Sequence, residues 1–245
     1  MRRAFTAPTA LAALAAAAQL ACAGCASPTY DRDGMQSRLQ ALHPELTSAR
    51  LDEIQSLEPT VTFPARIAVG QPGGARVWSG QRGWSADELE IIEAFGDELV
   101  AAGVASEVVV LPISLLTPTG NGRSETDLEA LRLGAARVHA DLLLLIDVVT
   151  DTDEWSNVLS VLDLTIVGMW LAPGQHRAAL TMVEGLLIDN ENEYLYSFAR
   201  GEGSDERVRP RKYADASLVR EKSRREALAR FGDAFVREAS KLARE

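Results

Sequence analysis

The residues that could do chemistry in this chain are mainly carboxylates. Asp151, Asp153 and Glu154 form a short acidic cluster, and Asp163 and Glu184 each fall in a predicted strand. Two carboxylates can act as general acid and base when a pocket holds both. A cluster can also bind a hard cation, but this one lacks the glycine and terminal glutamate of an EF-hand loop. We therefore expect a solvated loop at the cluster, and an exposed face of an antiparallel sheet at Asp163 and Glu184.

Other reactive side chains are few. His43, His139 and His176 fall in a polar leader, at a helix end and in a turn, so we expect no metal site and no catalytic triad. The sequence has no nucleophile elbow, no phosphate-binding loop and no His-Glu-x-x-His motif. These observations predict no catalytic residues, no metal and no cofactor. We expect a protein that is not an enzyme, with a hydrolase as the least favoured alternative.

Both cysteines lie in the first 25 residues, which have the layout of a secretory signal peptide. Two arginines at the start precede an apolar run from Leu11 to Ala21, and a small pair of residues leads to Cys25. This ending resembles the bacterial lipoprotein signal, which implies cleavage before Cys25 and lipidation of that cysteine. Cys22 stands where leucine is usual. An ordinary cleaved signal peptide is the alternative, and the run is short for the ~20 residues of a transmembrane helix.

A lipidated cysteine also predicts a location. Ala26 and Ser27 follow Cys25, and no aspartate does, which resembles the pattern sent to the outer membrane in Gram-negative bacteria. We expect a palmitate-bearing lipoprotein of the cell envelope, anchored in the outer membrane and facing the periplasm. The domain prediction is a signal peptide over 1–24, a polar tether with short helices over 25–63 and an α/β domain over 64–245.

Charge narrows the class of partner. The formal net charge is −10, and it becomes −12 when Arg2 and Arg3 are removed with the leader. An acidic protein of this kind is a poor match for nucleic acid. The expected partners are the membrane, through the lipid on Cys25, and an unidentified envelope protein.

Hydrophobic patterning beyond the leader predicts one α/β domain of order β-α-β-α-β-β-β-β-α. The continuous apolar run Leu142–Ile146 is typical of a strand covered on both faces. Ser85 and Glu88 form a capping box that opens a helix ending near Gly103. The expected strands are Arg66–Val69, Val108–Leu111, Leu142–Ile146, Val161–Leu171, Ala178–Ile188 and Tyr194–Ala199, and the expected later helices are Leu128–Val138 and Ala214–Ala243.

Two features are candidate contacts for a partner or a membrane. A basic stretch opposes the sign of the whole chain and could meet anionic headgroups or an acidic partner, or could be a solvated loop and helix start. Tryptophans flank the glycine-rich loop Gly70–Gly83 and could be binding anchors or lids on the core. The candidate contact residues are Trp78, Trp84, Arg207, Arg209, Arg211 and Lys212.

Three segments resemble the rhombotarget lipoproteins, a family of bacterial envelope lipoproteins. The segments are Pro64–Val69, Ser160–Trp170 and Thr181–Asp189, and the matching positions are Ser160, Thr165, Gly168, Thr181, Glu184, Asp189, Arg220 and Ser223. This resemblance implies an envelope lipoprotein.

The element order is also similar to that of curli-secretion channel subunits, the N-terminal domain of the Tol–Pal propeller protein and lipoprotein activators of peptidoglycan synthases. These proteins bind partners, so the similarity implies a periplasmic interaction or assembly module. A subunit of an oligomeric export structure is the alternative, and fold alone does not decide between them.

Overall fold

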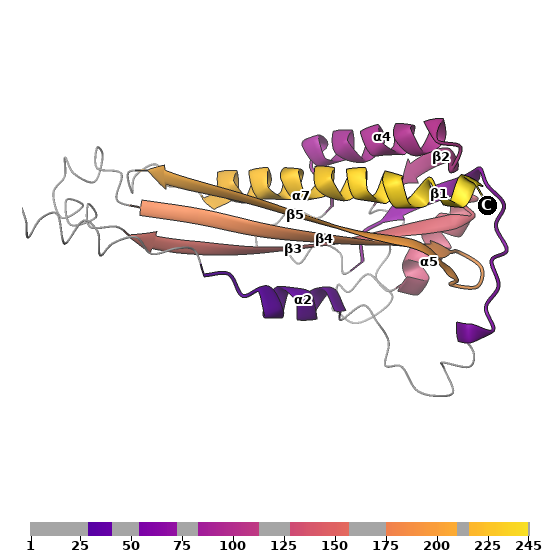
Figure 1. Cartoon of the computed structure of the whole chain (residues 1–245), viewed down its shortest axis with the longest axis horizontal. Coiled ribbons are helices and arrows are strands. Elements are labelled where there is room, and N and C mark those ends of the chain that lie inside the picture. The colour runs from indigo at the N-terminus through magenta and orange to yellow at the C-terminus, as the bar shows by residue number, and fades with distance from the viewer. Residues whose placement is uncertain are drawn as a thin grey trace, which may run out of the picture. The chain divides into compact units, whose positions relative to one another are not determined.

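The computed structural model describes residues 29–40, 54–72, 83–112, 128–156, 175–209 and 216–244. The strands are β1 (Ala65–Gly70), β2 (Ala105–Val110), β3 (Leu142–Ser156), β4 (Gln175–Asp189) and β5 (Leu195–Arg209). They form one mixed sheet in the order β2-β1-β3-β4-β5, with helices packed on it (Figure 1). The predicted fold class is therefore confirmed. The predicted strand Val161–Leu171 lies outside the described residues.

The described residues divide into two compact units, which share the three long strands. The larger unit draws on Asp31–Asp151, Leu180–Ser204 and Glu221–Glu245, and the smaller on Met1–Tyr30, Thr152–Ala179 and Asp205–Arg220. Strands β3, β4 and β5 each begin in one unit and end in the other. The larger unit contains the hydrophobic core.

Parallel pairing in the larger unit follows from two crossover helices. Strand β1 pairs in parallel with both β2 and β3, and the connections run through α4 (Ala86–Ala101) and α5 (Leu128–Arg137). Alternate residues of β3 enter two different clusters, Leu144 with α4 and Leu143 with α5. The two helices therefore cover opposite faces, which is why the apolar run of β3 shows no alternation.

The ends of α4 match the sequence signals. The side chain of Ser85 accepts a bond from the Glu88 backbone, and the Glu88 side chain accepts one from the Ser85 backbone. Gly103 has a φ of 74°, which suits the residue that follows a helix. The capping box and the glycine stop are therefore confirmed.

Glycines in β4 and β5 allow the long helix α7 (Ala216–Ala239) to lie close to these two strands. A Cβ atom on Gly201 would sit 2.2 Å from the Ala227 carbonyl oxygen, and one on Gly203 would sit 2.3 Å from that of Ser223. Only glycine permits such an approach of helix backbone to strand. The side chain of Phe231 occupies the space above Gly185 in the same way.

Aromatic rings join α7 to α4 on one face of the sheet. Phe231 and Phe235 are stacked with centroids 5.6 Å apart, and Phe95 of α4 meets both rings edge-on at 6.0 and 6.4 Å. The predicted apolar stripe of this helix is confirmed, since Leu228, Phe231, Phe235 and Ala239 are buried. Helix α7 ends at Ala239, and a short 3-10 turn, η4 (Leu242–Arg244), follows it.

Part of the segment expected to be a tether packs on the α/β domain. Helix α2 (Arg32–Gln40) lies in this segment, and its Met35 is fully buried. Arg32 forms a two-pronged ion pair with Glu202 of β5, with N–O distances of 2.8 and 3.0 Å. Further along, Phe63 packs against the main core cluster, which is the group of buried residues that includes Ile67, Phe95, Leu144 and Phe231.

Strands β3 and β5 extend furthest beyond their predicted bounds. Strand β3 continues to Ser156, so Asp151 to Glu154 lie in a strand and not in a loop. Strand β5 continues to Arg209, so Arg207 and Arg209 also lie in a strand. Both extensions are polar, and an apolar pattern therefore cannot mark them. Among the described residues, no helix is both long and apolar enough to cross a membrane.

Candidate functional site

The predicted contact residues divide between described and undescribed parts of the chain. Cys25, Trp78, Arg211 and Lys212 lie outside the described residues. Trp84 is half-buried and packs against the main core cluster, next to the N-cap of α4. This placement matches a lid on the core.

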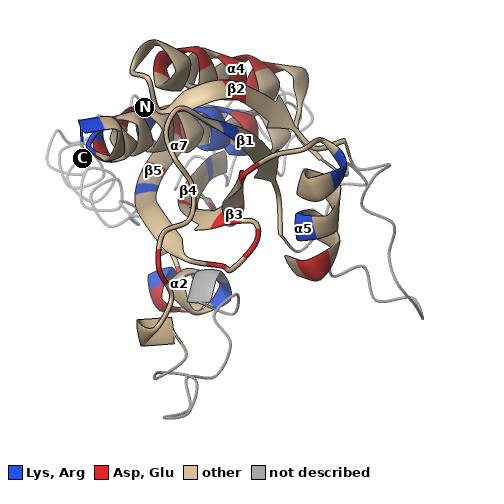
Figure 2. Cartoon of the chain, turned by 90° about the vertical axis from the view of Figure 1, so that its right-hand side faces the viewer, with Lys and Arg blue, Asp and Glu red and all other residues tan. Residues whose placement is uncertain are grey.

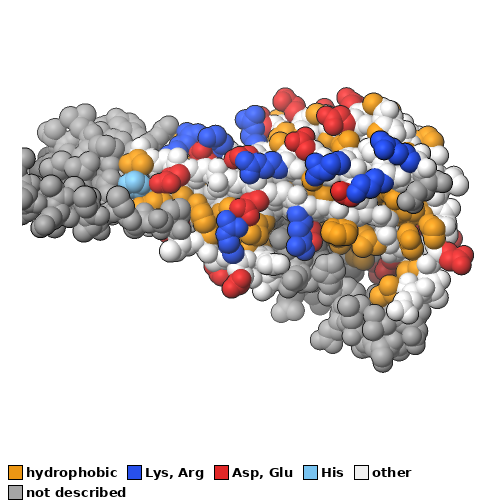
Figure 3. All heavy atoms as spheres, viewed as in Figure 1, with side chains coloured by type: hydrophobic (Ala, Val, Ile, Leu, Met, Phe, Trp, Pro, Cys, Tyr) orange, Lys and Arg blue, Asp and Glu red, His pale blue; other side chains and the backbone are white. Residues whose placement is uncertain are grey.

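The basic stretch comprises Arg207, Arg209, Arg211, Lys212, Arg220, Lys222, Arg224 and Arg225. Three of its described residues, Arg207, Arg224 and Arg225, form ion pairs. In the smaller unit, Arg207 donates through Nε to the buried Asp205 at 2.9 Å, and Arg209 is the last residue of β5. In the larger unit, Arg224 and Arg225 of α7 pair with Glu88 and Asp87 of α4 at 2.7 and 2.8 Å. Over α7 and β5, Figure 3 shows basic and acidic side chains interspersed.

Glu184 has a neighbour that explains its burial. Its side chain is 8% exposed, and its Oε1 accepts bonds from Nε and Nη2 of Arg200 on β5 at 2.9 and 2.8 Å. The expectation of an exposed position is wrong, because the ion pair with Arg200 lets the carboxylate be covered. Asp163, the other member of the suggested carboxylate pair, lies outside the described residues.

The acidic cluster on β3 binds backbone and side-chain donors. Asp151 accepts a bond from the Asp31 amide at 3.0 Å, and Asp153 accepts one from the Thr29 amide at 2.8 Å. Glu154 accepts from Gln175 and Arg177 of β4. The carboxylates thus fix neighbouring segments.

The two described histidines lie in different segments of the chain, and His176 lies in β4 and not in the turn expected for it. In the smaller unit, His176 stacks on Trp155 with ring centroids 5.1 Å apart, and its Nδ1 lies 3.3 Å from Glu206. His139 follows α5 with a φ of 54°, and His43 lies outside the described residues. Within the described part of the chain, no three His, Cys, Asp or Glu side chains are arranged to hold a metal ion.

Several residues that carry the family resemblance are buried polar groups with partners. The hydroxyl of Thr181 lies 2.9 Å from that of Thr150 and 2.8 Å from that of Ser223, which joins β3, β4 and α7. Asp189 accepts a bond from the Thr60 hydroxyl at 2.6 Å. A buried polar group must be paired to avoid a large cost, so these positions hold the fold together.

One hollow lies between α4 and the edge strand β2. It has a volume of about 240 Å³, an apolar floor and an acidic rim. The fully buried Ile92 lies at the floor, Val100, Val108 and Val110 complete the apolar lining, and the rim is Glu93, Asp97 and Glu107. A Cβ on Gly96 would come within 3.2 Å of Val108, so this glycine brings the helix down onto the strand.

The sequence interpretation missed this hollow, although a signal for it was present. From Trp84 to Pro112 the chain has seven acidic residues and no Lys, Arg or His. Figure 2 shows acidic positions along α4 and no basic ones. The hollow forms because α4 packs against β2 in the folded chain, and composition alone does not show which elements pack together.

Comparisons with known proteins give weak structural likenesses only. No protein-family model and no curated protein matches the chain. A PelC dodecamer from Paraburkholderia phytofirmans is 14% identical, over 74% of this chain and 87% of that one, with a TM-score of 0.30. Lipoprotein GNA1162 from Neisseria meningitidis is 13% identical, over 64% and 92%, with a TM-score of 0.33. A minor lipoprotein from Acinetobacter baumannii is 9% identical, over 75% and 94%, with a TM-score of 0.34. At these values the likenesses carry no argument about function.

Proposed function

We propose that this protein is a lipid-anchored lipoprotein of the bacterial envelope that acts as a non-enzymatic interaction or assembly module. The observation that carries the proposal is the leader, in which an apolar run ends in two small residues and Cys25. The lipid on Cys25 would hold the domain at the outer membrane, facing the periplasm.

The described carboxylates support a binding role. Glu184, Asp151 and Asp153 serve as acceptors for Arg200 and for backbone amides. These carboxylates are therefore engaged in contacts within the fold, and two other features of the surface are suited to contact with a partner. Phe198 on β5 is 60% exposed, and the hollow beside β2 is open to the surface.

The anchoring is tested with two cysteine variants in the native host. Cys25→Ala should abolish incorporation of labelled palmitate and release the protein from membranes. Cys22→Ala is the matched control and should change neither property. If the Cys25→Ala protein keeps the label, the lipidation proposal fails.

The interaction role is tested by photo-crosslinking in the intact envelope. A crosslinking residue at the exposed Phe198 should trap another envelope protein, whereas one at Asp33 on α2 is the comparison site. Crosslinks only between copies of this chain would favour the oligomeric alternative. Products of identical pattern at both sites would show that Phe198 makes no specific contact.

A further inference from the structure

The size of the hollow beside β2 suits a single side chain of a partner protein. Its volume of about 240 Å³ is below the range of small-molecule pockets, which start at about 300 Å³. Ile92 is fully buried at its base, while Val100 is 43% exposed at its margin. An apolar hollow of this size matches one inserted side chain of a larger partner.

The rim of the hollow has uncompensated negative charge. The Glu107 carboxylate forms an ion pair with Arg66, with a distance of 3.1 Å between Oε2 and Nη2. Glu93 and Asp97 are exposed, and neither has a basic partner among the ion pairs of the described residues. Elsewhere on α4, Asp87 and Glu88 are matched by arginines of α7. Glu90 and Glu98 of α4 are also exposed, so α4 presents a negative surface that includes the side lining the hollow.

The strand beside the hollow is an edge strand. Among the described residues, strand β2 stands at one end of the sheet order and pairs with β1 alone. An edge strand can take an additional extended segment by main-chain hydrogen bonds, while adjacent pockets select the side chains. Alternate side chains of such a segment would point toward the face of the sheet that α4 covers, where the hollow lies.

We infer that the groove between α4 and β2, defined by Ile92, Val100, Val108, Glu93 and Asp97, binds an extended cationic segment of another envelope protein. One apolar side chain of the segment fills the hollow, and flanking Lys or Arg side chains meet the rim. The chain's net charge of −10 opposes association of two copies. This inference rests on the interaction role proposed above and names the chemistry of the partner.

The test uses the full chain in uncharged detergent and a seven-residue Lys-Val peptide, Ser-Lys-Ser-Val-Ser-Lys-Ser, as probe. Its two Lys side chains and its Val side chain lie on one face of an extended segment. Fluorescence anisotropy should show binding that weakens as salt rises, because exposed charges are screened. A Glu-Val peptide of the same length should not bind. Glu93→Gln with Asp97→Asn should weaken binding of the Lys-Val peptide by at least about tenfold, a loss of about 1.4 kcal/mol.

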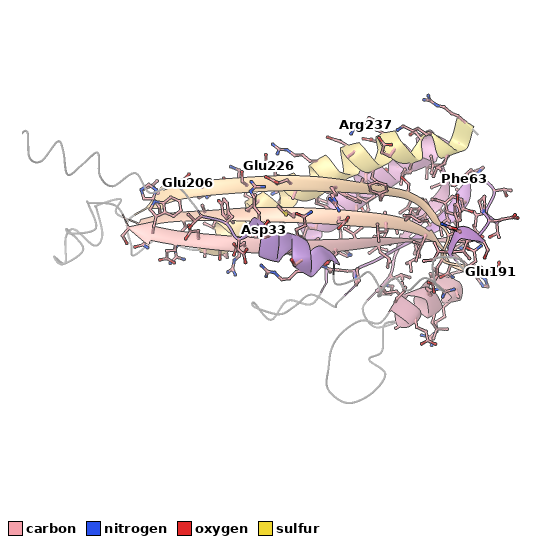
Figure 4. All side chains as sticks on the ribbon, turned by 60° about the horizontal axis from the view of Figure 1, so that its bottom comes forward. Asp33, Phe63, Glu191, Glu206, Glu226 and Arg237 are labelled. Carbon is pink, nitrogen blue, oxygen red and sulfur yellow. The ribbon has the colours of Figure 1, made fainter. Side chains whose placement is uncertain are left out.

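A matched double variant controls for net charge. Asp33→Asn with Glu191→Gln removes the same two charges from α2 and from the β4–β5 turn (Figure 4), and should change the affinity less than about twofold. Amide exchange of Ser106 to Val110 should slow when the peptide is bound, since an added strand protects backbone amides.

Three results would overturn the inference. Equal losses in both double variants would show general attraction to an acidic protein. Binding without slower exchange in β2 would exclude strand addition. An oligomer in sedimentation that Glu93→Gln with Asp97→Asn dissociates would make a second copy the occupant. Peptide binding by Cys25→Ala should equal that of the wild type, so failure of the anchor and failure of the groove are separable.

Discussion

Tyr196 joins the segment before β1 to strand β5. Its hydroxyl oxygen accepts a bond from the Val61 amide at 2.9 Å, and its ring meets Phe63 edge-on at 5.7 Å. Burial raises the pKa of Tyr196 above its usual value of 10.0, and the nearby Asp189 carboxylate adds to the rise, although the bonds from the Val61 and Thr60 backbone lower it. Figure 4 shows Phe63 at the same end of the sheet as Glu191 of the β4–β5 turn.

Replacement of Tyr196 by Phe should lower the free energy of unfolding by about 1 kcal/mol near neutral pH, because the Val61 amide loses its acceptor. A raised pKa in the folded state means that the unfolded tyrosine ionises first. Its contribution is therefore fully present below pH of about 10 and is lost as pH rises through the folded pKa. Urea unfolding at pH 7 and about pH 11 should show the difference between the two proteins shrinking at the higher pH. A difference that stays constant would contradict the assignment.

Helix α7 and strand β5 are in close backbone contact in the larger unit. The distances leave no room for a side chain on Gly203, where a Cβ would lie 2.3 Å from the Ser223 carbonyl oxygen and 2.4 Å from the Ala227 amide nitrogen. Backbone atoms cannot move aside as a flexible side chain can.

Gly203→Ala should therefore destabilise the fold by about 1–3 kcal/mol, measured by denaturant unfolding. Ser204→Ala is the control, since Ser204 is exposed on the next position of β5, and it should stay within about 0.5 kcal/mol of wild type. Equal effects of the two changes would show that α7 is not held as close as described.

The elements that could be predicted from the sequence are those with strong apolar patterns. The run Leu142–Ile146 and the stripe through Phe231 and Phe235 predicted a doubly covered strand and a packed helix correctly. The polar ends of β3 and β5 were not predictable, because partners such as Asp31 for Asp151 come from distant parts of the chain. Burial of Glu184 was missed for the same reason, since Arg200 is 16 residues away on the next strand.

At the scale of the whole molecule, the segment before β1 is bound by the β3 carboxylates. Asp151→Ala with Asp153→Ala removes the acceptors of the Asp31 and Thr29 amides. Trypsin should then cleave after Arg32 or Arg38 about ten times faster than in wild type, because local opening becomes more favourable. Overall unfolding should change by less than about 1 kcal/mol.

The control for this change is Glu93→Gln with Asp97→Asn, which removes two charges from α4 and should leave the cleavage rate unaltered. Faster cleavage in both proteins would attribute the effect to net charge and not to the lost acceptors.

The hydrogen bond between the Thr29 amide and Asp153 also limits the distance between Cys25 and the domain. An extended chain covers at most about 3.5 Å per residue, so four residue steps from Cys25 to Thr29 span about 14 Å. Thr60 is held separately by Asp189, so release of the segment before it would give 35 steps from Cys25 and a reach of about 120 Å. The β3 carboxylates and the ion pair of Arg32 with Glu202 would therefore limit how far the domain can stand from a membrane to which Cys25 is anchored as proposed.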